Sequence, residues 1–150
     1  MLNAFVMRDG RLEQILVDRF EDLNEAALWV DMVDPSEEER AWVETAYRFE
    51  LPEEEEINDI EASARFYEDE DGSHIHSFFL HNFEEQTQNI TVAFNLHRSR
   101  LFTIHEEDLA AFRLFRLRAR RIPGFVKDAT DIMLNLYETE VELVLSLIHI

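Results

Sequence analysis

The chain contains no cysteine, and only three of its 150 residues are glycine and three are proline. Without cysteine there are no disulfides, no thiolate-ligated zinc sites and no thiol nucleophile, which suits a reducing compartment. So few glycines and prolines exclude a linker-rich or low-complexity protein, and they leave no glycine-rich cradle for a phosphate group. Several large classes of protein are therefore excluded at the outset.

Long apolar segments are missing as well. No stretch reaches the roughly 18–20 apolar residues that a membrane helix needs, and residues 1–10 lack the basic start and apolar run of a signal peptide. We therefore expect the chain as given to be soluble. Hydrophobic residues still make up 46% of the sequence and aromatic residues 11%. This composition predicts one folded domain with a substantial core rather than disorder.

The charge is strongly one-sided, with 33 acidic against 14 basic residues and a net charge of -19. Such a field repels nucleic acid and anionic lipid and attracts cations or basic partners. Residues 34–71 hold 16 acidic residues against three Arg, whereas residues 98–121 hold seven Arg against three acidic residues. This asymmetry predicts either self-complementary assembly or pairing within the domain.

Hydrophobic periodicity predicts strands in the first two-thirds of the chain and helices at its end. The predicted strands are 2–7, 11–17, 27–33, 64–68, 73–83, 90–96 and 101–105, and the predicted helices are 35–48, 53–60, 108–121 and 125 onward. For the first helix, Asp34 is the expected N-cap, Pro35 the first helical residue and Glu37 the partner in a capping box. This order favours an α/β or α+β fold, in which a mixed sheet is sandwiched between helices.

One domain is expected over residues 1–124, followed by the start of a long stalk helix over residues 125–142. That helix has apolar positions at helical spacing and no residue that would end it. Residues 143–150, LVLSLIHI, lose its polar face and would expose apolar surface unless packed. We interpret them as an atypical tail, either an oligomer seam or residues foreign to the parent protein, and favour the second.

No set of catalytic residues is visible, because the motifs GxGxxG, GxxxxGK[ST], GxSxG and HExxH are all absent. The chain is therefore predicted not to be an enzyme, and no catalytic or cofactor-binding residue is assigned. His74 and His76 alternate along one predicted strand and face the same side, but we interpret them as ordinary strand histidines rather than metal ligands. Arg113, Arg116 and Arg120 share one helical face and are expected to pair with the domain's own acidic face, not with nucleic acid.

The carboxylates are the better candidates for binding. Glu53–Glu56, with Asp59 one helical turn further on, form a dense acidic patch. Mg²⁺ takes oxygen ligands and is often bound by one or two protein carboxylates together with retained waters. From the residues alone, a weak Mg²⁺ site and a merely solvated acidic face both remain open.

Three stretches resemble the CorA family of magnesium and cobalt transporters: WVDMVDPSEEER (29–40), DIEASARFYEDEDGSHIHSFF (59–79) and TVAFNLHRSRLFTIHEEDLAAFRLFRLRAR (91–120). The similarity covers about residues 1–142, whereas in the family the last helix continues long and charged where LVLSLIHI stands. The resemblance implies αβα domains on the cytoplasmic face of the bacterial inner membrane. It also implies a homopentamer, a stalk helix and two membrane helices per subunit, which lie outside this chain.

The resemblance further implies a Mg²⁺-sensing regulatory domain of a channel for Mg²⁺ and Co²⁺. Weakly bound Mg²⁺ between neighbouring subunits would neutralise facing carboxylates and hold the pore closed, and loss of Mg²⁺ would open it. Asp59 matches the family's acidic sensor position, and Glu138 matches an acidic position early in the last helix. Both are therefore predicted Mg²⁺ ligands. The alternatives are a freestanding acidic interaction domain, the cytoplasmic domain of a related zinc transporter and, third, a metal-dependent hydrolase.

Overall fold

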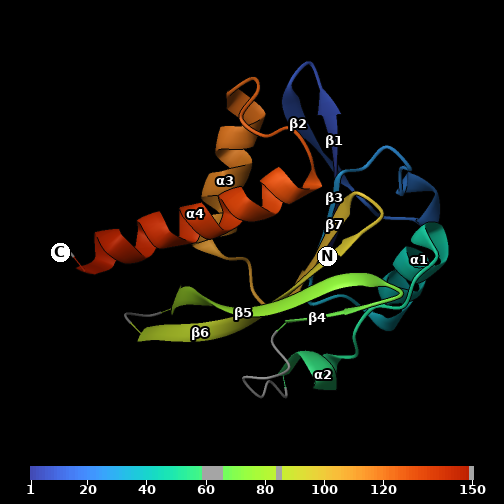
Figure 1. Cartoon of the computed structure of the whole chain (residues 1–150), viewed down its shortest axis with the longest axis horizontal. Helices are drawn as coiled ribbons and strands as arrows, with labels where there is room; N and C mark the ends of the chain where they lie inside the picture. The colour runs from blue at the N-terminus through green and yellow to red at the C-terminus, as the bar shows by residue number, and fades with distance from the viewer. Residues whose placement is uncertain (59–65, 84–85, 149–150) are drawn as a thin grey trace.

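The computed structural model describes residues 1–58, 66–83 and 86–148, which form a seven-stranded sheet with helices on both faces (Figure 1). The strand order is β2-β1-β3-β7-β6-β5-β4. The strands are β1 (Leu2–Arg8), β2 (Arg11–Leu16), β3 (Trp29–Val33), β4 (Phe66–Asp69), β5 (Gly72–Phe83), β6 (Gln86–His97) and β7 (Arg100–His105). The helices are η1 (Phe20–Asp22), α1 (Glu37–Tyr47), α2 (Glu54–Asn58), α3 (Ala110–Arg121) and α4 (Ala129–Ile148). The predicted αβα arrangement is confirmed.

The sheet is mixed because β3 and β7 pair in parallel, whereas the other described pairs are antiparallel. In this parallel pair Asp31 lies beside Thr103, and Val33 lies beside His105. The two strands therefore end at the same edge of the sheet. Polar residues that are more than 70 positions apart in the chain become neighbours there.

Strand alternation divides the core into two layers, one on each face of the sheet. On the face covered by α3 and α4, Trp29 is fully buried and stacks on Phe5, with ring centroids 4.2 Å apart. On the face covered by α1 and α2, Val30 packs in a second cluster, which also contains the tilted pair of Phe49 and Phe102 at 4.3 Å. Strands β1, β3, β6 and β7 therefore contribute side chains to both cores.

The predicted start of the first helix is wrong by two residues. Ser36, not Asp34, is the N-cap: its Oγ accepts from the Glu39 amide at 3.1 Å, and Glu39 Oε1 accepts from the Ser36 amide at 3.0 Å. Asp34 instead has a positive φ of 45°. Its amide donates to the carbonyl of His105 at 2.8 Å, which joins the ends of β3 and β7. Because the sequence offers two overlapping capping-box patterns, the tertiary bond of Asp34 selects the second.

Other boundaries differ from the predicted ones as well, among them the starts of β6, α3 and α4. Strand β6 begins at Gln86 rather than at residue 90, because a polar stretch without hydrophobic alternation still pairs with the end of β5. Helix α3 begins at Ala110, since Asp108 lies before it and accepts from Arg113 and Arg116. Helix α4 begins at residue 129, not 125. None of the described helices is both long enough and apolar enough to cross a membrane.

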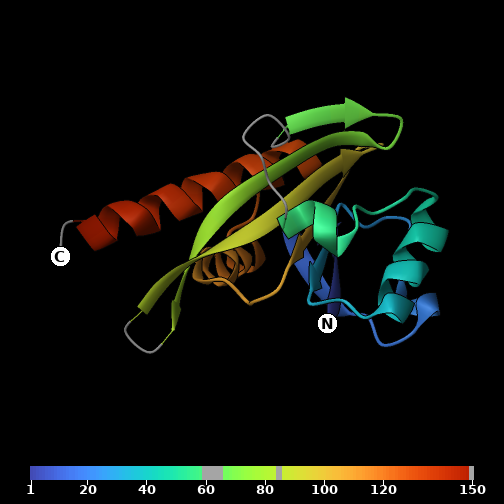
Figure 2. The same cartoon turned by 90° about the horizontal axis from the view of Figure 1, so that it is seen from below.

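Helix α4 runs alongside β5 and is bonded to it (Figure 2). The hydroxyls of Tyr137 and Ser77 lie 2.6 Å apart, and Glu140 Oε2 accepts from the Leu80 amide at 2.9 Å. Burial raises the pKa of Glu140, and the bond from Leu80 acts against this shift. The helix continues to Ile148, so residues 143–148 of the atypical tail are helical. Whether that tail is foreign to the parent protein stays a prediction.

Candidate cation-binding cleft

A hollow of about 1250 Å³ lies between α2, one side of α1 with the segment that leads from α1 to α2, and the sheet. Its described lining contains eleven carboxylates: Asp34, Glu37, Glu44, Glu50, Glu53, Glu54, Glu55, Glu56, Asp69, Asp71 and Glu106. Arg40 is the single Arg or Lys side chain among these lining residues. We call this hollow the acidic cleft. Its charge makes it a site that attracts cations.

One wall of the acidic cleft is α2 and the segment that leads into it. Ile57 is buried and anchors the helix, while Glu54–Glu56 in its first turn are exposed. The leading segment is tied to α1, since the Leu51 amide donates to Glu44 Oε2 at 3.1 Å and the Arg40 guanidinium donates to the carbonyl of Pro52. The glutamates are thereby held on a fixed support and face the solvent of the cleft.

A second wall is the turn between β4 and β5, which contributes Asp69 and Asp71 to the lining. Asp69 Oδ1 accepts from the Asp71 amide at 2.9 Å and lies 2.8 Å from His74 Nε2. Gly72 has a φ of +106°, and a Cβ at this position would lie 2.1 Å from the carbonyl oxygen of Leu96. Only glycine therefore allows the turn to pack this closely on β6, which places the carboxylate of Asp69 at the cleft.

The floor of the cleft is formed by histidine and tyrosine side chains of β4 and β5. His74 and His76 are 3% and 4% exposed, and the ring of Tyr67 stacks on that of His74 with centroids 4.5 Å apart. Burial, followed by the neighbouring His74, lowers the pKa of His76, and Glu56 acts in the opposite direction. Burial and then the charges of Glu56 and Asp69 raise the pKa of Tyr67. Carboxylates of both walls therefore influence the pKa values of the side chains at the floor.

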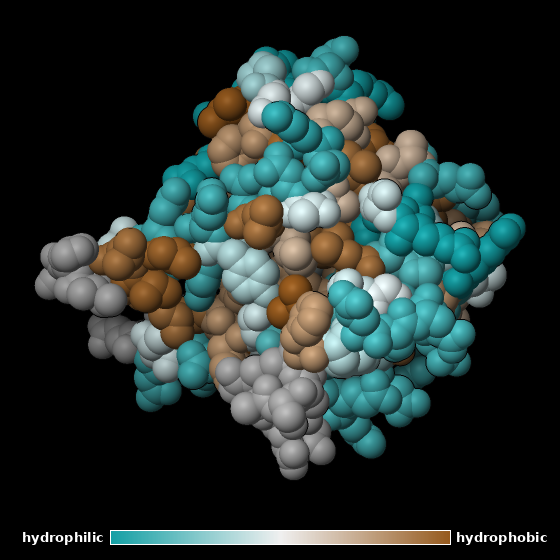
Figure 3. Space-filling view, viewed as in Figure 1, coloured by the Kyte–Doolittle hydropathy of each residue, from teal (hydrophilic) through white to brown (hydrophobic). Residues whose placement is uncertain are grey.

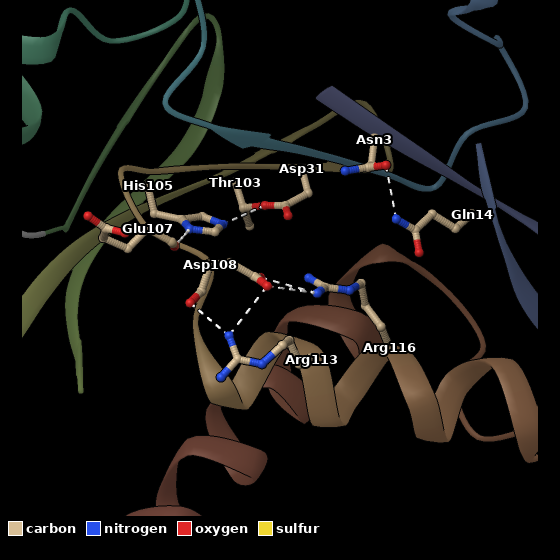
Figure 4. Close-up of polar contacts among 9 residues, drawn as sticks. All are labelled: Asn3, Gln14, Asp31, Thr103, His105, Glu107, Asp108, Arg113 and Arg116. Atoms are coloured by element: carbon tan, nitrogen blue, oxygen red, sulfur yellow. Dashed lines mark hydrogen bonds and ion pairs between the residues drawn. The ribbon is translucent and has the colours of Figure 1, made fainter. Parts of the chain in front are cut away.

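A second group of buried polar side chains connects β3 to β7 (Figure 4). Trp29 Nε1 donates to Thr103 Oγ1 at 2.8 Å, and Thr103 Oγ1 donates to Asp31 Oδ1 at 2.6 Å. His105 Nε2 lies 2.7 Å from the same oxygen, and its Nδ1 lies 2.6 Å from the carbonyl oxygen of Glu107. Because His105 also lines the acidic cleft, this group connects the cleft to the core under α3.

The His105–Asp31 pair is almost completely buried, with Asp31 1% and His105 2% exposed. Burial alone lowers the pKa of His105. The charge and hydrogen bond of Asp31, the Glu107 carbonyl and the charge of Asp108 outweigh burial, so the pKa of His105 is raised. Sequence inspection missed this pair, although an aspartate within the apolar run ALWVDMV was a visible sign of a buried polar contact.

The described part of the structure contains one of the two predicted Mg²⁺ ligands, Glu138. Asp59 follows α2 in the sequence and lies outside the described residues. Glu138 is exposed on α4, on the face of the sheet opposite α2 (Figure 1). Across residues 1–58, 66–83 and 86–148, no three or more His, Asp or Glu side chains are already gathered around one point as a metal site. The assignment of both residues stays a prediction.

Three arginines of α3, including the predicted Arg113 and Arg116, pair with acidic residues of the same chain. Arg113 and Arg116 both reach Asp108, at 3.3 Å and 3.1 Å, and Arg118 reaches Glu142 of α4 at 2.8 Å. Pairing within the domain, one of the two outcomes left open by the charge asymmetry, therefore occurs, with partners outside the acidic cleft.

Comparison with known proteins identifies a family. The model of the CorA-like Mg²⁺ transporter proteins matches residues 24–149. Over 143 residues, 95% of this chain, the sequence is 46% identical to the magnesium transport protein CorA of Yersinia pseudotuberculosis and 46% identical to that of Haemophilus ducreyi. The chain spans 45% of the length of each of these relatives.

Solved structures agree on the fold. The CorA magnesium transporter from Methanocaldococcus jannaschii superposes with a TM-score of 0.67 at 20% identity, over 95% of this chain and 44% of that protein. The full-length CmaX protein superposes with a TM-score of 0.69 at 11% identity, over 99% of this chain and 47% of that protein. At these identities the likeness supports the architecture, while the family rests on the sequence matches.

Proposed function

Because the chain belongs to the family of CorA-like Mg²⁺ transporter proteins, we propose that it is the Mg²⁺-sensing regulatory domain of a channel that takes up Mg²⁺ and Co²⁺. In this proposal the domain stands on the cytoplasmic face of the bacterial inner membrane, and the membrane-spanning part belongs to the rest of the protein. The observation that carries the proposal is the acidic cleft, whose described lining holds eleven carboxylates and one arginine.

The chemistry of the cleft suits a hydrated Mg²⁺ ion held weakly. Glu54–Glu56 and Asp69 line the same cleft from two of its walls, and Mg²⁺ keeps several waters while it binds one or two carboxylates. Binding would lower the repulsion between these walls, and loss of Mg²⁺ would restore it. A cation can shift the state of the domain only by binding one state more tightly than the other. The mutual repulsion of the walls supplies that difference.

A mechanical path connects the cleft to the last helix. Strand β5 carries His74 and His76 at the floor of the cleft, and further along it Ser77 and the Leu80 amide contact α4. A change in the separation of the cleft walls would therefore act on β5 and reach α4 through the bonds of Tyr137 and Glu140. In the proposed channel, α4 begins the stalk and passes this movement to the membrane part.

The outer face of α4 supports assembly with further copies of the chain. Leu134, Val141, Leu145 and Leu147 are all at least 43% exposed, and the C-terminal half of the helix forms an apolar surface (Figure 3). An exposed apolar surface of this kind needs a partner. In the proposed homopentamer it packs against a neighbouring subunit, and the exposed carboxylate of Glu138 lies at that contact.

We predict that Mg²⁺ raises the melting temperature of this chain more than Na⁺ does at the same ionic strength. At ten times its dissociation constant, Mg²⁺ would add about 1.4 kcal/mol to the stability of the folded state. For a domain of this size that corresponds to a rise of about 3–6 °C. Asp59→Ala is expected to reduce the difference between the two cations. Differential scanning calorimetry with paired MgCl₂ and NaCl series measures both effects.

Asp18→Ala is the matched control, because it removes the same charge at an exposed position away from the acidic cleft. It should leave the Mg²⁺ effect unchanged. Equal shifts with Mg²⁺ and Na⁺ in the unmodified chain would mean that the cations only screen charge. The freestanding acidic interaction domain would then be the better explanation.

A further inference from the structure

The floor of the acidic cleft holds buried ring nitrogens without partners. Both ring nitrogens of His76 and the Nδ1 of His74 are inaccessible to solvent and make no hydrogen bond. Both amide atoms of Asn95, the cross-strand neighbour of His74, are in the same condition. A buried polar atom without a partner costs about 1–3 kcal/mol. Five such atoms in neighbouring side chains indicate that this part of the cleft binds a ligand.

Asp69 determines which ring nitrogen of His74 is available to bind a metal ion. A carboxylate only accepts hydrogen bonds, so the contact of 2.8 Å from Asp69 Oδ1 to Nε2 places the ring hydrogen on Nε2. The lone pair is then on Nδ1, the nitrogen without a partner. A carboxylate that orients a histidine through its second nitrogen is the usual arrangement behind metal-binding histidines. The structure therefore presents a histidine in the tautomer that binds metal.

We propose that His74 and His76 form a two-histidine site for a borderline divalent ion such as Zn²⁺, Ni²⁺ or Co²⁺, separate from the Mg²⁺ response. The two residues are separated by one position on β5, so their rings project from the same face of the strand into the acidic cleft. Neutral imidazole is a preferred ligand of these ions, whereas Mg²⁺ takes oxygen ligands. The nitrogen donors, not the acidic walls, thus determine which ion binds.

Two imidazoles leave other coordination positions to be filled. Glu56 is exposed and lines the same cleft as both histidines, so its carboxylate is the proposed third ligand, together with water. The amide of Asn95 can hydrogen-bond such a water. A site with two fixed ligands and a mobile third is expected to bind reversibly, as a sensor does, rather than to hold a permanent structural ion.

Calorimetric titration of Zn²⁺ into the chain, with Mg²⁺ in large excess, tests this proposal. Excess Mg²⁺ competes for binding that uses carboxylates alone, whereas it does not compete for imidazole nitrogens. Zn²⁺ binding that persists in this excess therefore reports on the histidines, whether or not Mg²⁺ itself binds the cleft. One Zn²⁺ should bind per chain, and His76→Gln should weaken its binding at least tenfold. Asp69→Asn should also weaken it about tenfold, because it removes the partner that orients His74. Equal affinity in the unmodified chain and His76→Gln would overturn the proposal, as would the absence of any Zn²⁺ binding.

His81→Gln is the matched control. His81 belongs to the same strand, but its odd position places it on the opposite face of the sheet from His74 and His76. Its substitution should leave the Zn²⁺ affinity unchanged, and a loss equal to that of His76→Gln would contradict the assignment.

A measurement on the unmodified chain covers the case in which the His76 variant does not fold. Co²⁺ should give strong visible ligand-field bands, and its paramagnetism should broaden the ring resonances of His74 and His76 before those of His81. Broadening that spreads over the acidic side chains and leaves both rings unaffected would show that the ion binds carboxylates alone, and would refute the site.

Discussion

Replacing His105 with leucine is expected to lower the free energy of unfolding by about 3–5 kcal/mol. The substitution leaves the carboxylate of Asp31 almost fully buried without the imidazole that lies 2.7 Å from it. Among the described residues, Thr103 is then the one side chain that still donates to that carboxylate. A buried charge that loses its partner retains its full cost of desolvation. Urea unfolding at pH 6 measures this loss.

The pH dependence of the stability difference between the unmodified chain and His105→Leu shows whether the lost ion pair causes that difference. Because the folded pKa of His105 is raised, the charged pair stabilises the fold fully below about pH 6.5, the ordinary value for an unfolded histidine. That contribution declines as the pH rises through the folded pKa. His76 acts in the opposite sense: its pKa is lowered, so its contribution is lost as the pH falls below about 6.5. The difference between the unmodified chain and His105→Leu should therefore narrow above neutral pH.

His97→Leu is the matched control, because it also removes a buried imidazole but separates no ion pair. His97 is 6% exposed, and its ring stacks on Phe49 at 5.1 Å. His97→Leu should lower the free energy of unfolding by less than His105→Leu does. Because it leaves the His105–Asp31 pair in place, it should also keep the pH dependence that this pair contributes. A pH-independent loss in His105→Leu would contradict the account, because removal of packing alone would then explain it.

The second large effect is expected for Phe112→Ala, with a loss of about 3–5 kcal/mol. Phe112 is fully buried at the centre of the core under α3. Its ring lies 5.9 Å from that of Trp29, 5.6 Å from that of Phe79 and 4.5 Å from that of His105, measured between centroids. Its removal leaves a cavity between rigid rings that cannot collapse to fill it.

Thermal unfolding checks this prediction, since each kcal/mol corresponds to about 2–4 °C for a domain of this size. Leu117→Ala is the control on the same helix, because Leu117 is 37% exposed. Its expected cost is about 1 kcal/mol or less. Similar costs for the two variants would mean that the core under α3 is not packed as described.

The order of the elements could be predicted from the sequence because it depends on local periodicity. Alternation along β6 and helical spacing along α4 indicated the right elements, and the layered architecture followed from their order. The exact ends could not be predicted. Asp34 and Ser36 both fit a capping box, and only the bond from Asp34 to β7 decides between them. That bond joins residues 71 positions apart, so no local pattern reveals it.

The candidate site was predictable in its parts but not in its assembly. Glu53–Glu56 were predicted as an acidic patch, and His74 and His76 were correctly placed on one face of a strand. That the turn at Asp69 forms a second wall follows only from the pairing of β4 with β5 and the close approach at Gly72. The contact of His105 with Asp31 likewise depends on the parallel register of β3 and β7.

The central claim, that the acidic cleft binds Mg²⁺, is tested most directly by a magnetic resonance titration of backbone amides. With ionic strength held constant, Mg²⁺ is predicted to shift the amides of Glu54–Glu56 and Asp69–Asp71 along saturable curves that share one dissociation constant. Replacing Glu54–Glu56 with glutamine should weaken that binding, while the amide of Glu21, an exposed acid of η1, should show no saturable shift. Shifts that are linear in Mg²⁺, spread evenly over the acidic surface and reproduced by Na⁺ would contradict the claim.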